Sequence, residues 1–373
     1  MQFYGKTKIC YGAYALETLE ELSSRQAFIV TDPFMVKSGF ADVVKSHLDR
    51  RGIGHRTFDG VEPDPSLETV TKGTVQFMHD KADLIIALGG GSAIDAAKAI
   101  AFFAYKADES RGKPTLVAIP TTSGTGSEVT AISVITDKVN EVKIPLNDEL
   151  LIPDIAILDA RFTRTVPPGV TAATGMDVLT HAIEAYTSRQ ANAFTSIYAK
   201  YAIRYVFQYL YRTYQNMDDM EGREMMQLGS CMAGMAFNNS GLGITHSIAH
   251  SLGGIFHIPH GLANAVMLPY VIKFNSFDVG VKYWEIAKRL ALPSNTVEEG
   301  TSSLIKAVRD LNASMGIPAR ISEMRPGGKP IDREVFRGHL DTISRNALED
   351  ICTGGNPRRP SGEDIKNILD EAW

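Results

Sequence analysis

The apolar residues follow two different spacings along this chain, one before and one after about residue 165. In the first part, short apolar runs alternate with segments whose apolar residues recur at helical spacing. The runs with strand character are Ala27–Thr31, Asp83–Leu88, Thr115–Ile119 and Ile155–Leu158, and the helical segments between them include Phe40–Arg51 and Ser66–Lys81. Two further runs, Ile132–Thr136 and Glu141–Ile144, predict an added hairpin. Strands that alternate with helices predict a parallel sheet covered on both faces.

Long helical stretches replace the strand-like runs after Thr163. They are Thr171–Ser188, Thr195–Tyr214, Glu221–Phe237, Val281–Leu290, Val297–Met315 and Asp332–Ile343, followed by a short terminal helix capped at Ser361. The Pro167-Pro168-Gly169 segment at the junction is typical of a domain boundary. We therefore expect an α/β domain over residues 1–165 and an all-helical domain over residues 166–373.

The composition is that of a water-soluble globular protein with no nucleic-acid or membrane partner. The formal net charge of −5 comes without a basic block that would neutralise phosphates. No apolar run is long enough for a membrane span, and the first residues lack the apolar stretch of a signal peptide. The three cysteines, Cys10, Cys231 and Cys352, are scattered and include no CxxC pair, so we expect a reduced, cytoplasmic chain.

Five of the nine histidines lie between Gly175 and His260. Asp177 and His181 are four residues apart in a helical segment, so they project from one face, and His246 and His250 repeat that spacing. His260 follows Pro259 at an expected helix start. An isolated histidine usually packs or faces solvent, but small and apolar residues around His246 and His250 suggest burial, where an unpaired imidazole is costly. A carboxylate with three or four imidazoles suits a first-row divalent metal.

Two glycine-rich turns follow expected strands in the first part of the chain. Asp83–Leu88 runs into Gly89-Gly90-Gly91-Ser92 and then a helical segment, and Thr115–Ile119 runs into Pro120–Ser127, which contains three threonines and two glycines. Bare backbone N–H groups at a helix N-terminus bind the phosphates of a nucleotide. Each turn alone is equally compatible with an ordinary loop. Two of them at the carboxyl ends of parallel strands favour a dinucleotide site.

GMDVLTHAIEAY and HSIAHSLGGIFHIPHGLANAVMLP, read from Gly175 and His246, resemble the iron-containing (group III) alcohol dehydrogenases, closest to the propanol and butanol dehydrogenase branch. The resemblance implies a Rossmann-like dinucleotide-binding domain followed by a helical metal-binding domain, an architecture shared with dehydroquinate synthase. It also implies that Asp177, His181, His246 and His260 are the metal ligands, with Fe²⁺ as the ion and Zn²⁺ as an alternative. His250 would lie near the metal and the nicotinamide as the catalytic proton carrier, and His257 would have no required role.

The glycine-rich turns match the same family through GGGSxxDxAK and PTTxGTGSE. The resemblance places the pyrophosphate of NAD at Gly89, Gly90, Gly91 and Ser92. It places nicotinamide or ribose near Asp95, Thr121, Thr122 and Thr125, and it makes Lys143 a ribose contact and Asp64 a neighbour of the adenosine. Asp32 ends the first expected strand, where a carboxylate accepts hydrogen bonds from a ribose 2′-hydroxyl and disfavours NADP.

These elements predict a metal-dependent, NAD-linked alcohol dehydrogenase that interconverts short-chain primary alcohols and aldehydes. By the same resemblance, Ile132 and Phe237 match positions that line the substrate site of the family. Both are apolar, which favours ethanol, 1-propanol or butanol over polar substrates. The alternatives are a glycerol or polyol dehydrogenase, a dehydroquinate synthase-like enzyme, and a non-catalytic nucleotide- or metal-binding regulator. The resemblance further implies a homodimer or higher homo-oligomer, either free in the cytoplasm or inside a bacterial microcompartment.

Overall fold

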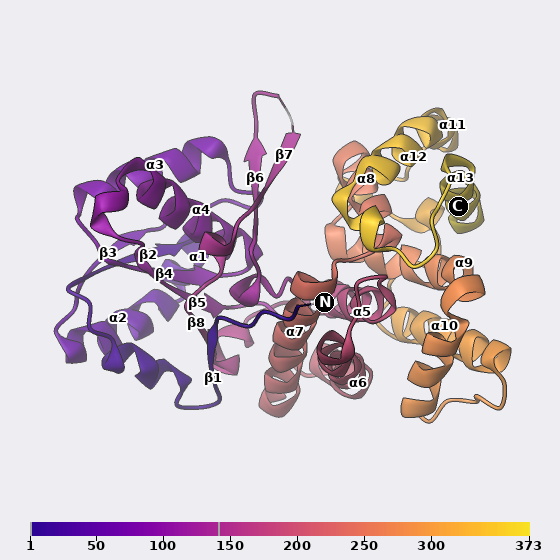
Figure 1. The fold of residues 1–373 in the computed structure, drawn as a ribbon, viewed down its shortest axis with the longest axis horizontal. Coiled ribbons are helices and arrows are strands. Elements are labelled where there is room, and N and C mark those ends of the chain that lie inside the picture. The colour runs from indigo at the N-terminus through magenta and orange to yellow at the C-terminus, as the bar shows by residue number, and fades with distance from the viewer. Residues whose placement is uncertain (1, 141) are drawn as a thin grey trace. The chain divides into compact units, whose positions relative to one another are not determined.

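The structure is a computed structural model that describes residues 2–140 and 142–373. The chain forms two compact units (Figure 1). One unit is Tyr4–Val166, and the other is Pro167–Trp373 together with the N-terminal residues up to Phe3. The first unit is built on a sheet and the second is helical, so the expected fold class is confirmed.

A six-stranded sheet in the order β1-β8-β5-β4-β2-β3 forms the centre of the first unit, and all its strand pairs are parallel. The strands are β1 (Lys8–Tyr11), β2 (Gln26–Thr31), β3 (Gly54–Phe58), β4 (Leu84–Gly89), β5 (Thr115–Pro120) and β8 (Ile155–Leu158). The helices are α1 (Pro33–Lys37), α2 (Phe40–Arg51), α3 (Leu67–His79) and α4 (Gly91–Ala107).

The central strands are apolar on both faces because each face packs against its own helices. Along β4, Ile85 and Ala87 belong to an apolar cluster with residues of α3 and α4, while Leu84 and Ile86 belong to a second cluster with residues of α2. This alternation follows from the two-residue period of a strand. The strands predicted from continuous apolar runs are confirmed, with β4 and β5 each one residue longer at the carboxyl end.

The edge strands β1 and β3 were not predicted. They are partly exposed, and β3 (GHRTF) carries the polar residues of an edge, so neither has the apolar run that marks a central strand. The hairpin is present as β6 (Ile132–Asp137) and β7 (Val142–Asn147), which pair antiparallel. Strand β7 continues through Pro145, beyond the predicted end at Ile144, and the predicted first residue, Glu141, lies outside the described residues.

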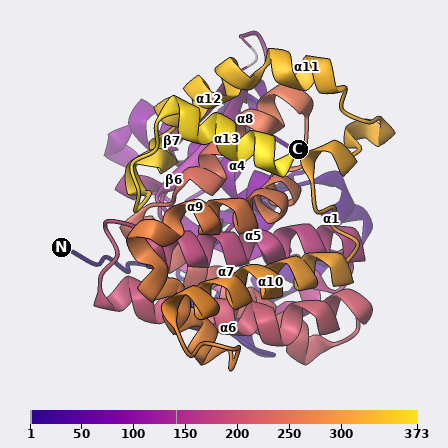
Figure 2. The ribbon, with the colours of Figure 1, turned by 90° about the vertical axis from the view of Figure 1, so that its right-hand side faces the viewer.

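The second unit is a bundle of helices, several of which lie alongside one another in Figure 2. They are α5 (Pro168–Thr187), α6 (Ala193–Gln215), α7 (Met220–Ser240), α8 (Ile244–Phe256), α9 (His260–Arg289), α10 (Val297–Ser314), α11 (Arg333–Gly338), α12 (Leu340–Glu349) and α13 (Gly362–Ala372). Ser361 caps α13 as expected, through a reciprocal pair of hydrogen bonds with Asp364.

Two of the predicted helices were wrong in extent. The segment Val281–Leu290 is the end of α9, which starts at His260, contains Pro269 and has one non-helical residue at Val279. The helix start expected at His260 is confirmed, but the residues between it and Val281 were not predicted as helix, because proline usually ends a helix. The segment Asp332–Ile343 is two helices, α11 and α12, which are separated at His339.

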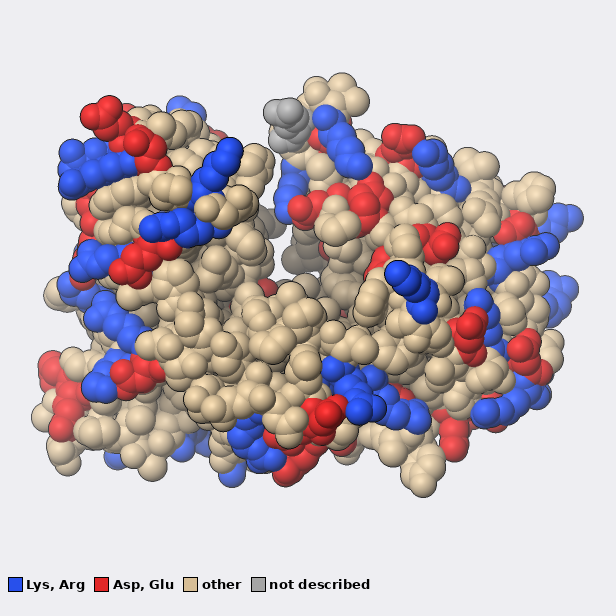
Figure 3. Space-filling model, turned by 180° about the vertical axis from the view of Figure 1, so that it is seen from behind, with Lys and Arg blue, Asp and Glu red and all other residues tan. Residues whose placement is uncertain are grey.

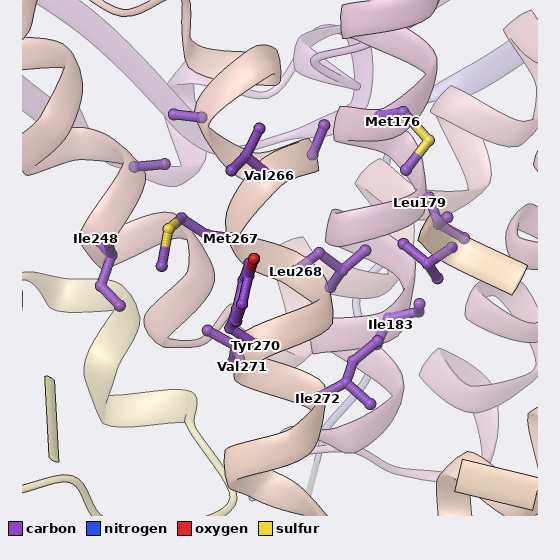
Figure 4. Packing of buried hydrophobic residues seen from close by; sticks show 14 of the residues in the cluster. Met176, Leu179, Ile183, Ile248, Val266, Met267, Leu268, Tyr270, Val271 and Ile272 are labelled. Carbon is purple, nitrogen blue, oxygen red and sulfur yellow. The ribbon is translucent and has the colours of Figure 1, made fainter. Parts of the chain in front are cut away.

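The core of the helical unit fixes how α5 faces its neighbours. Met176, Leu179 and Ile183 of α5 are buried in one apolar cluster with Leu268 and Ile272 of α9, and Figure 4 shows the side chains of the two helices side by side. Helical spacing places Asp177, His181 and Glu184 on a different face of α5 from these apolar residues.

Surface charges of both signs are interspersed over the face of the molecule drawn in Figure 3. Within residues 2–140 and 142–373, no helix has the length and apolar character needed to cross a membrane. Among the described residues, Cys10, Cys231 and Cys352 form no disulfide bond.

Candidate active site

Helix α5 presents one polar face to the interior of the helical unit. Asp177, His181 and Glu184 follow at intervals of four and three residues, and each is at most 5% exposed. Two neighbouring helix starts meet this face, because His246 lies in the first turn of α8 and His260 is the first residue of α9.

The structure brings Asp177, His181, His246 and His260 together, with one ligand atom from each lying within 4.8 Å of all the others. Asp177 Oδ1 lies 3.7 Å from His246 Nε2 and 3.4 Å from His260 Nε2. The His181 and His246 rings stack with their centroids 4.5 Å apart. A carboxylate and three imidazoles at these separations form a donor set suited to a divalent first-row metal.

The hydrogen bonding of His246 fits a metal ion at this cluster. Its Nδ1 lies 2.6 Å from Glu184 Oε2, whereas its Nε2 is buried and makes no hydrogen bond with any described residue. A buried, unsatisfied ring nitrogen is costly, and a cation between the four side chains would satisfy it.

The protonation states favoured by the surroundings are also those of metal ligands. Burial lowers the pKa of His246 well below its ordinary value, so its ring is neutral. Burial raises the pKa of Asp177, but the three histidines and a hydrogen bond from Asn264 outweigh it and hold that pKa below the ordinary value. A neutral imidazole and an ionised carboxylate are the forms that bind a metal.

Glu184 belongs to this site and was not predicted. It lies one helical turn after His181 and seven residues after Asp177, so the spacing that identified those two residues also marked it. Its contact with His246 depends on how α5 packs against α8, which helical periodicity alone does not give.

The structure places His250 at the edge of this cluster. Its ring centroid lies 5.1 Å from that of His260 and 6.2 Å from that of His246. The expected burial is wrong for His250, whose side chain is 44% exposed, because α8 turns this residue away from the core face that holds His246. Its Nδ1 lies 2.8 Å from Asp350 Oδ2.

Asp350 was also missed, since it lies 100 residues from His250 in the chain. Burial raises the pKa of Asp350, but the hydrogen bond and charge of His250 and contacts with Cys352 outweigh it, bringing that pKa to about 2. The carboxylate therefore stays ionised at neutral pH. His257 lies outside the cluster and ends α8 in the left-handed conformation, with φ of 55°.

The two glycine-rich turns lie against each other at the carboxyl ends of the adjacent strands β4 and β5. Gly89 ends β4, Gly90 caps α4 and Gly91 opens it. A Cβ on Gly91 would lie 2.7 Å from Thr125 Cγ2, and one on Gly90 would lie 3.4 Å from Thr122. The threonines of the second turn therefore approach the backbone of the first at the N-terminus of α4.

The remaining predicted cofactor residues make contacts of their own. Lys143 Nζ lies 2.6 Å from Asp64 Oδ1, and the Asp64 N–H donates to Ser92 Oγ at 3.3 Å. Asp95 accepts from Ser127 Oγ at 2.6 Å and from the Val134 N–H at 3.0 Å, so its carboxylate holds the second turn to the hairpin. Thr121 is buried, and its N–H donates to the Gly89 carbonyl at 3.0 Å.

Asp32 has two neighbours that bear on its predicted role. Its Oδ1 accepts from the N–H groups of Phe34 and Met35 and so caps α1. Its Oδ2 lies 3.6 Å from the position that a Cβ on Gly89 would occupy. The carboxylate is therefore both a helix cap and a neighbour of the first glycine-rich turn.

Comparison with known sequences identifies the family. A profile described as iron-containing alcohol dehydrogenase matches residues 6–160, and one described as the C-terminal part of the Fe-containing alcohol dehydrogenase family matches residues 171–373. The chain belongs to this family. It is 44% identical to an NADPH-dependent butanol dehydrogenase of Clostridium saccharobutylicum, over 99% of this chain and 97% of that protein.

Two further relatives of the iron-containing alcohol dehydrogenase agree with this assignment. A 1-propanol dehydrogenase of Citrobacter freundii is 38% identical over 98% of both chains. The crystal structure of a sulfoacetaldehyde reductase from Bifidobacterium kashiwanohense in complex with NAD⁺ superposes with a TM-score of 0.89 and 27% identity, covering 100% of this chain and 98% of that one. The predictions of an oxidoreductase and of a relation to the butanol and propanol dehydrogenases are confirmed.

The two residues expected at the substrate site lie in different units. The Phe237 ring stacks on the His181 ring with centroids 4.6 Å apart, so an apolar surface adjoins the metal-binding cluster. Ile132 opens β6, and its carbonyl accepts a hydrogen bond from Lys98.

Proposed function

We propose that this iron-containing alcohol dehydrogenase interconverts short-chain primary alcohols, such as ethanol, 1-propanol and butanol, with their aldehydes, and uses NAD as the hydride carrier. The observation that carries the proposal is the cluster of Asp177, His181, His246 and His260, with its buried, unbonded His246 Nε2. These four side chains would hold one divalent ion, Fe²⁺ in the cell, and Zn²⁺ should bind at least as tightly. When bound, the ion would supply a Lewis acid that polarises the carbonyl oxygen of the aldehyde and favours loss of the alcohol proton.

The residues around the cluster would move the proton. Oxidation of an alcohol removes a hydride from carbon and a proton from oxygen, and His250 would take that proton. Its half-exposed position beside His260 supports this role. Its Nδ1 faces the Asp350 carboxylate, which leaves Nε2 as the acceptor. From there the proton can pass to solvent.

The cofactor would bind in the sheet-containing unit. The N–H groups at the start of α4, with Gly89, Gly90, Gly91 and Ser92, would receive the pyrophosphate, and the Thr121, Thr122 and Thr125 hydroxyls of the second turn would hold the ribose and nicotinamide. Lys143 and Asp64, which pair with each other, would lie near the adenosine half. We further propose that residues 1–165 and 166–373 act as the nucleotide-binding and metal-binding domains.

We propose that the substrate site is apolar, which favours short-chain alcohols over polyols. Phe237 covers one side of His181 within the helical unit, and the family resemblance assigns Ile132, in the other unit, to the substrate site as well. A glycerol or other polyol would leave hydroxyl groups without partners against these side chains, which costs binding free energy.

The protein is proposed to act as a homodimer or larger homo-oligomer in the cytoplasm, free or enclosed in a microcompartment. Phe194, Ile197 and Tyr201 support self-association, because they lie along one face of α6 and are 61%, 55% and 45% exposed. Sedimentation of the purified protein would report its oligomeric state.

The test combines metal content with turnover. Anaerobically iron-loaded protein should bind about one metal per chain under this four-ligand scheme and should form NADH from 1-propanol faster than from glycerol. His181→Ala and His260→Ala should each lose metal and activity together. His257→Asn is the matched control, since asparagine tolerates the left-handed conformation at the end of α8. Full metal content in both alanine variants would refute the ligand assignment.

A further inference from the structure

We propose that Glu184 positions His246 for metal binding by fixing which nitrogen of its ring carries the proton. The inference rests on the proposed metal site and deepens it. It concerns a residue that lies behind the ligands, on the helix that carries two of them.

Two backbone N–H groups and one ring nitrogen of His246 point at the Glu184 carboxylate. Oε2 accepts from the Gly243 N–H at 2.8 Å and lies 2.6 Å from His246 Nδ1, while Oε1 accepts from the Thr245 N–H at 2.7 Å. Glu184 is 4% exposed, so water does not compete for these bonds. Burial raises the pKa of Glu184, and the hydrogen bonds from Thr245 and Gly243 oppose that shift. Each carboxylate oxygen accepts one of these backbone N–H groups, and an ionised carboxylate accepts hydrogen bonds and donates none.

The consequence for His246 follows from its single ring proton. A neutral imidazole has one N–H and one lone pair, and the carboxylate holds the N–H at Nδ1. The lone pair is then at Nε2, the atom that is buried among the other ligands without a hydrogen bond. A carboxylate that orients a metal-binding histidine in this way raises its affinity for the ion.

The same carboxylate sets the position of α8. Gly243 and Thr245 lie at its N-terminus, where backbone N–H groups have no partner inside the helix. A Cβ on Gly243 would lie 2.9 Å from Glu184 Oε1 and 2.8 Å from Asn356 Oδ1, so the chain approaches both side chains as closely as glycine allows. Helix α5 therefore carries Asp177 and His181 and also orients the ligand that comes from α8.

Glu184→Gln tests the inference with little change in volume. A glutamine offers one acceptor oxygen to three donors, so its NH₂ group must face an N–H or favour the wrong proton position on His246. We expect the affinity of the full chain for Zn²⁺, measured by competition with a chelator, to fall about 10- to 100-fold. The visible absorption spectrum of the Co²⁺-loaded protein should change as well.

Asn356→Ala is the matched control, because Asn356 accepts from the Ile244 N–H at 3.3 Å and so contacts the same end of α8 without touching a histidine. Its Zn²⁺ affinity should stay near that of the wild type. Equal weakening in both variants would assign Glu184 a merely structural role, and unchanged Zn²⁺ affinity in Glu184→Gln would also overturn the proposal. A wild-type protein that binds neither Zn²⁺ nor Co²⁺ would instead refute the metal site itself.

A measurement on the wild type removes any dependence on the folding of a variant. Long-range ¹H–¹⁵N correlation spectra of histidine-labelled protein distinguish the two neutral forms of the ring. The proposal requires the proton of His246 on Nδ1. A proton on Nε2 in the metal-free protein would overturn it.

Discussion

Lys98 is the most completely buried charge in the sheet-containing unit, and its replacement by methionine should destabilise that unit strongly. The side chain is 0% exposed, and its ammonium group donates to Ser127 Oγ, to the Thr130 carbonyl and hydroxyl, and to the Ile132 carbonyl, at 2.8 to 3.0 Å. These bonds tie α4, which begins at the first glycine-rich turn, to the segment that follows the second. Burial lowers the pKa of Lys98 to about 8, and the nearby carboxylates of Asp95 and Glu128 oppose that shift.

The expected loss is about 3–5 kcal/mol, the usual cost of removing one partner of a buried charge pair. Methionine keeps most of the volume, so a cavity adds little, but two backbone carbonyls and two hydroxyl groups lose their donor, at about 1–3 kcal/mol for each buried group left unsatisfied. These costs are not additive, because Asp95 and Glu128 can take up protons in the variant.

The loss of stability caused by Lys98→Met should grow between about pH 6 and 8. Burial raises the pKa of Glu128 to about 7, against its own backbone hydrogen bond and the charge of Lys98. A carboxyl whose pKa is raised by folding binds more protons in the native state, so its contribution to stability falls as pH rises. Without Lys98 this pKa moves higher still, and the fall continues past pH 7.

Native-state hydrogen exchange read by mass spectrometry is the suitable assay, because Trp284 and Trp373 both lie in the helical unit and do not report on the sheet. Peptides from α4 and β6 should exchange their amide hydrogens faster in Lys98→Met than in the wild type, because the opening of this region costs less free energy in the variant. Lys106→Met is the control on the same helix, where a half-exposed lysine pairs with Glu109 at 3.3 Å, and it should change stability by less than about 0.5 kcal/mol. A Lys98→Met variant as protected as this control, or a loss independent of pH, would refute the reasoning.

Two predictions concern the proposed chemistry. His250→Ala should lower turnover by about 10²- to 10⁴-fold and alter the pH dependence of turnover, while the metal content stays normal. His257→Asn is the control. Loss of metal in His250→Ala would instead make His250 a ligand. Asp32→Asn keeps the oxygen that caps α1 but removes the charge that opposes a 2′-phosphate, a repulsion of roughly 4 kcal/mol at about 4 Å before screening by solvent. Its kcat/KM for NADP should therefore rise about tenfold or more relative to NAD, and equal use of the two by the wild type would show that Asp32 is a cap alone.

The sequence predicted most reliably those elements whose burial is uniform. Strands β2, β4 and β5 lie between helices on both faces of the sheet, and each has a continuous apolar sequence. Edge strands β1 and β3 have half-exposed, mixed residues, so a local pattern does not separate them from loops. In α9 the tertiary environment overrides a local rule, because the buried surroundings of Pro269 accept a proline inside a helix.

The candidate metal site was predictable within each segment but not between segments. The spacing of Asp177 and His181 predicts that both lie on one face of α5. No periodicity in the sequence indicates that α8 and α9 start beside that helix. The family resemblance supplied that step, and the structure places the four ligand atoms together. Glu184 and Asp350 were missed because each contacts its histidine across a helix packing contact, 62 and 100 residues away in the chain.

The arrangement of α5 explains how a helical core can hold so many polar groups. Asp177, His181 and Glu184 are all buried, and each would destabilise an apolar interior if it stood alone. Asn264 donates to Asp177, and the start of α8 donates to Glu184, so hydrogen bonds reduce the cost of burying both carboxylates. For Glu184 burial still outweighs them and raises its pKa. The Nε2 of His246 has no such bond, although its ring is held on the other side. These hydrogen bonds orient Asp177 and His246 around a buried Nε2 that a metal ion would satisfy, and a site whose ligands are oriented in advance needs little rearrangement to bind the ion.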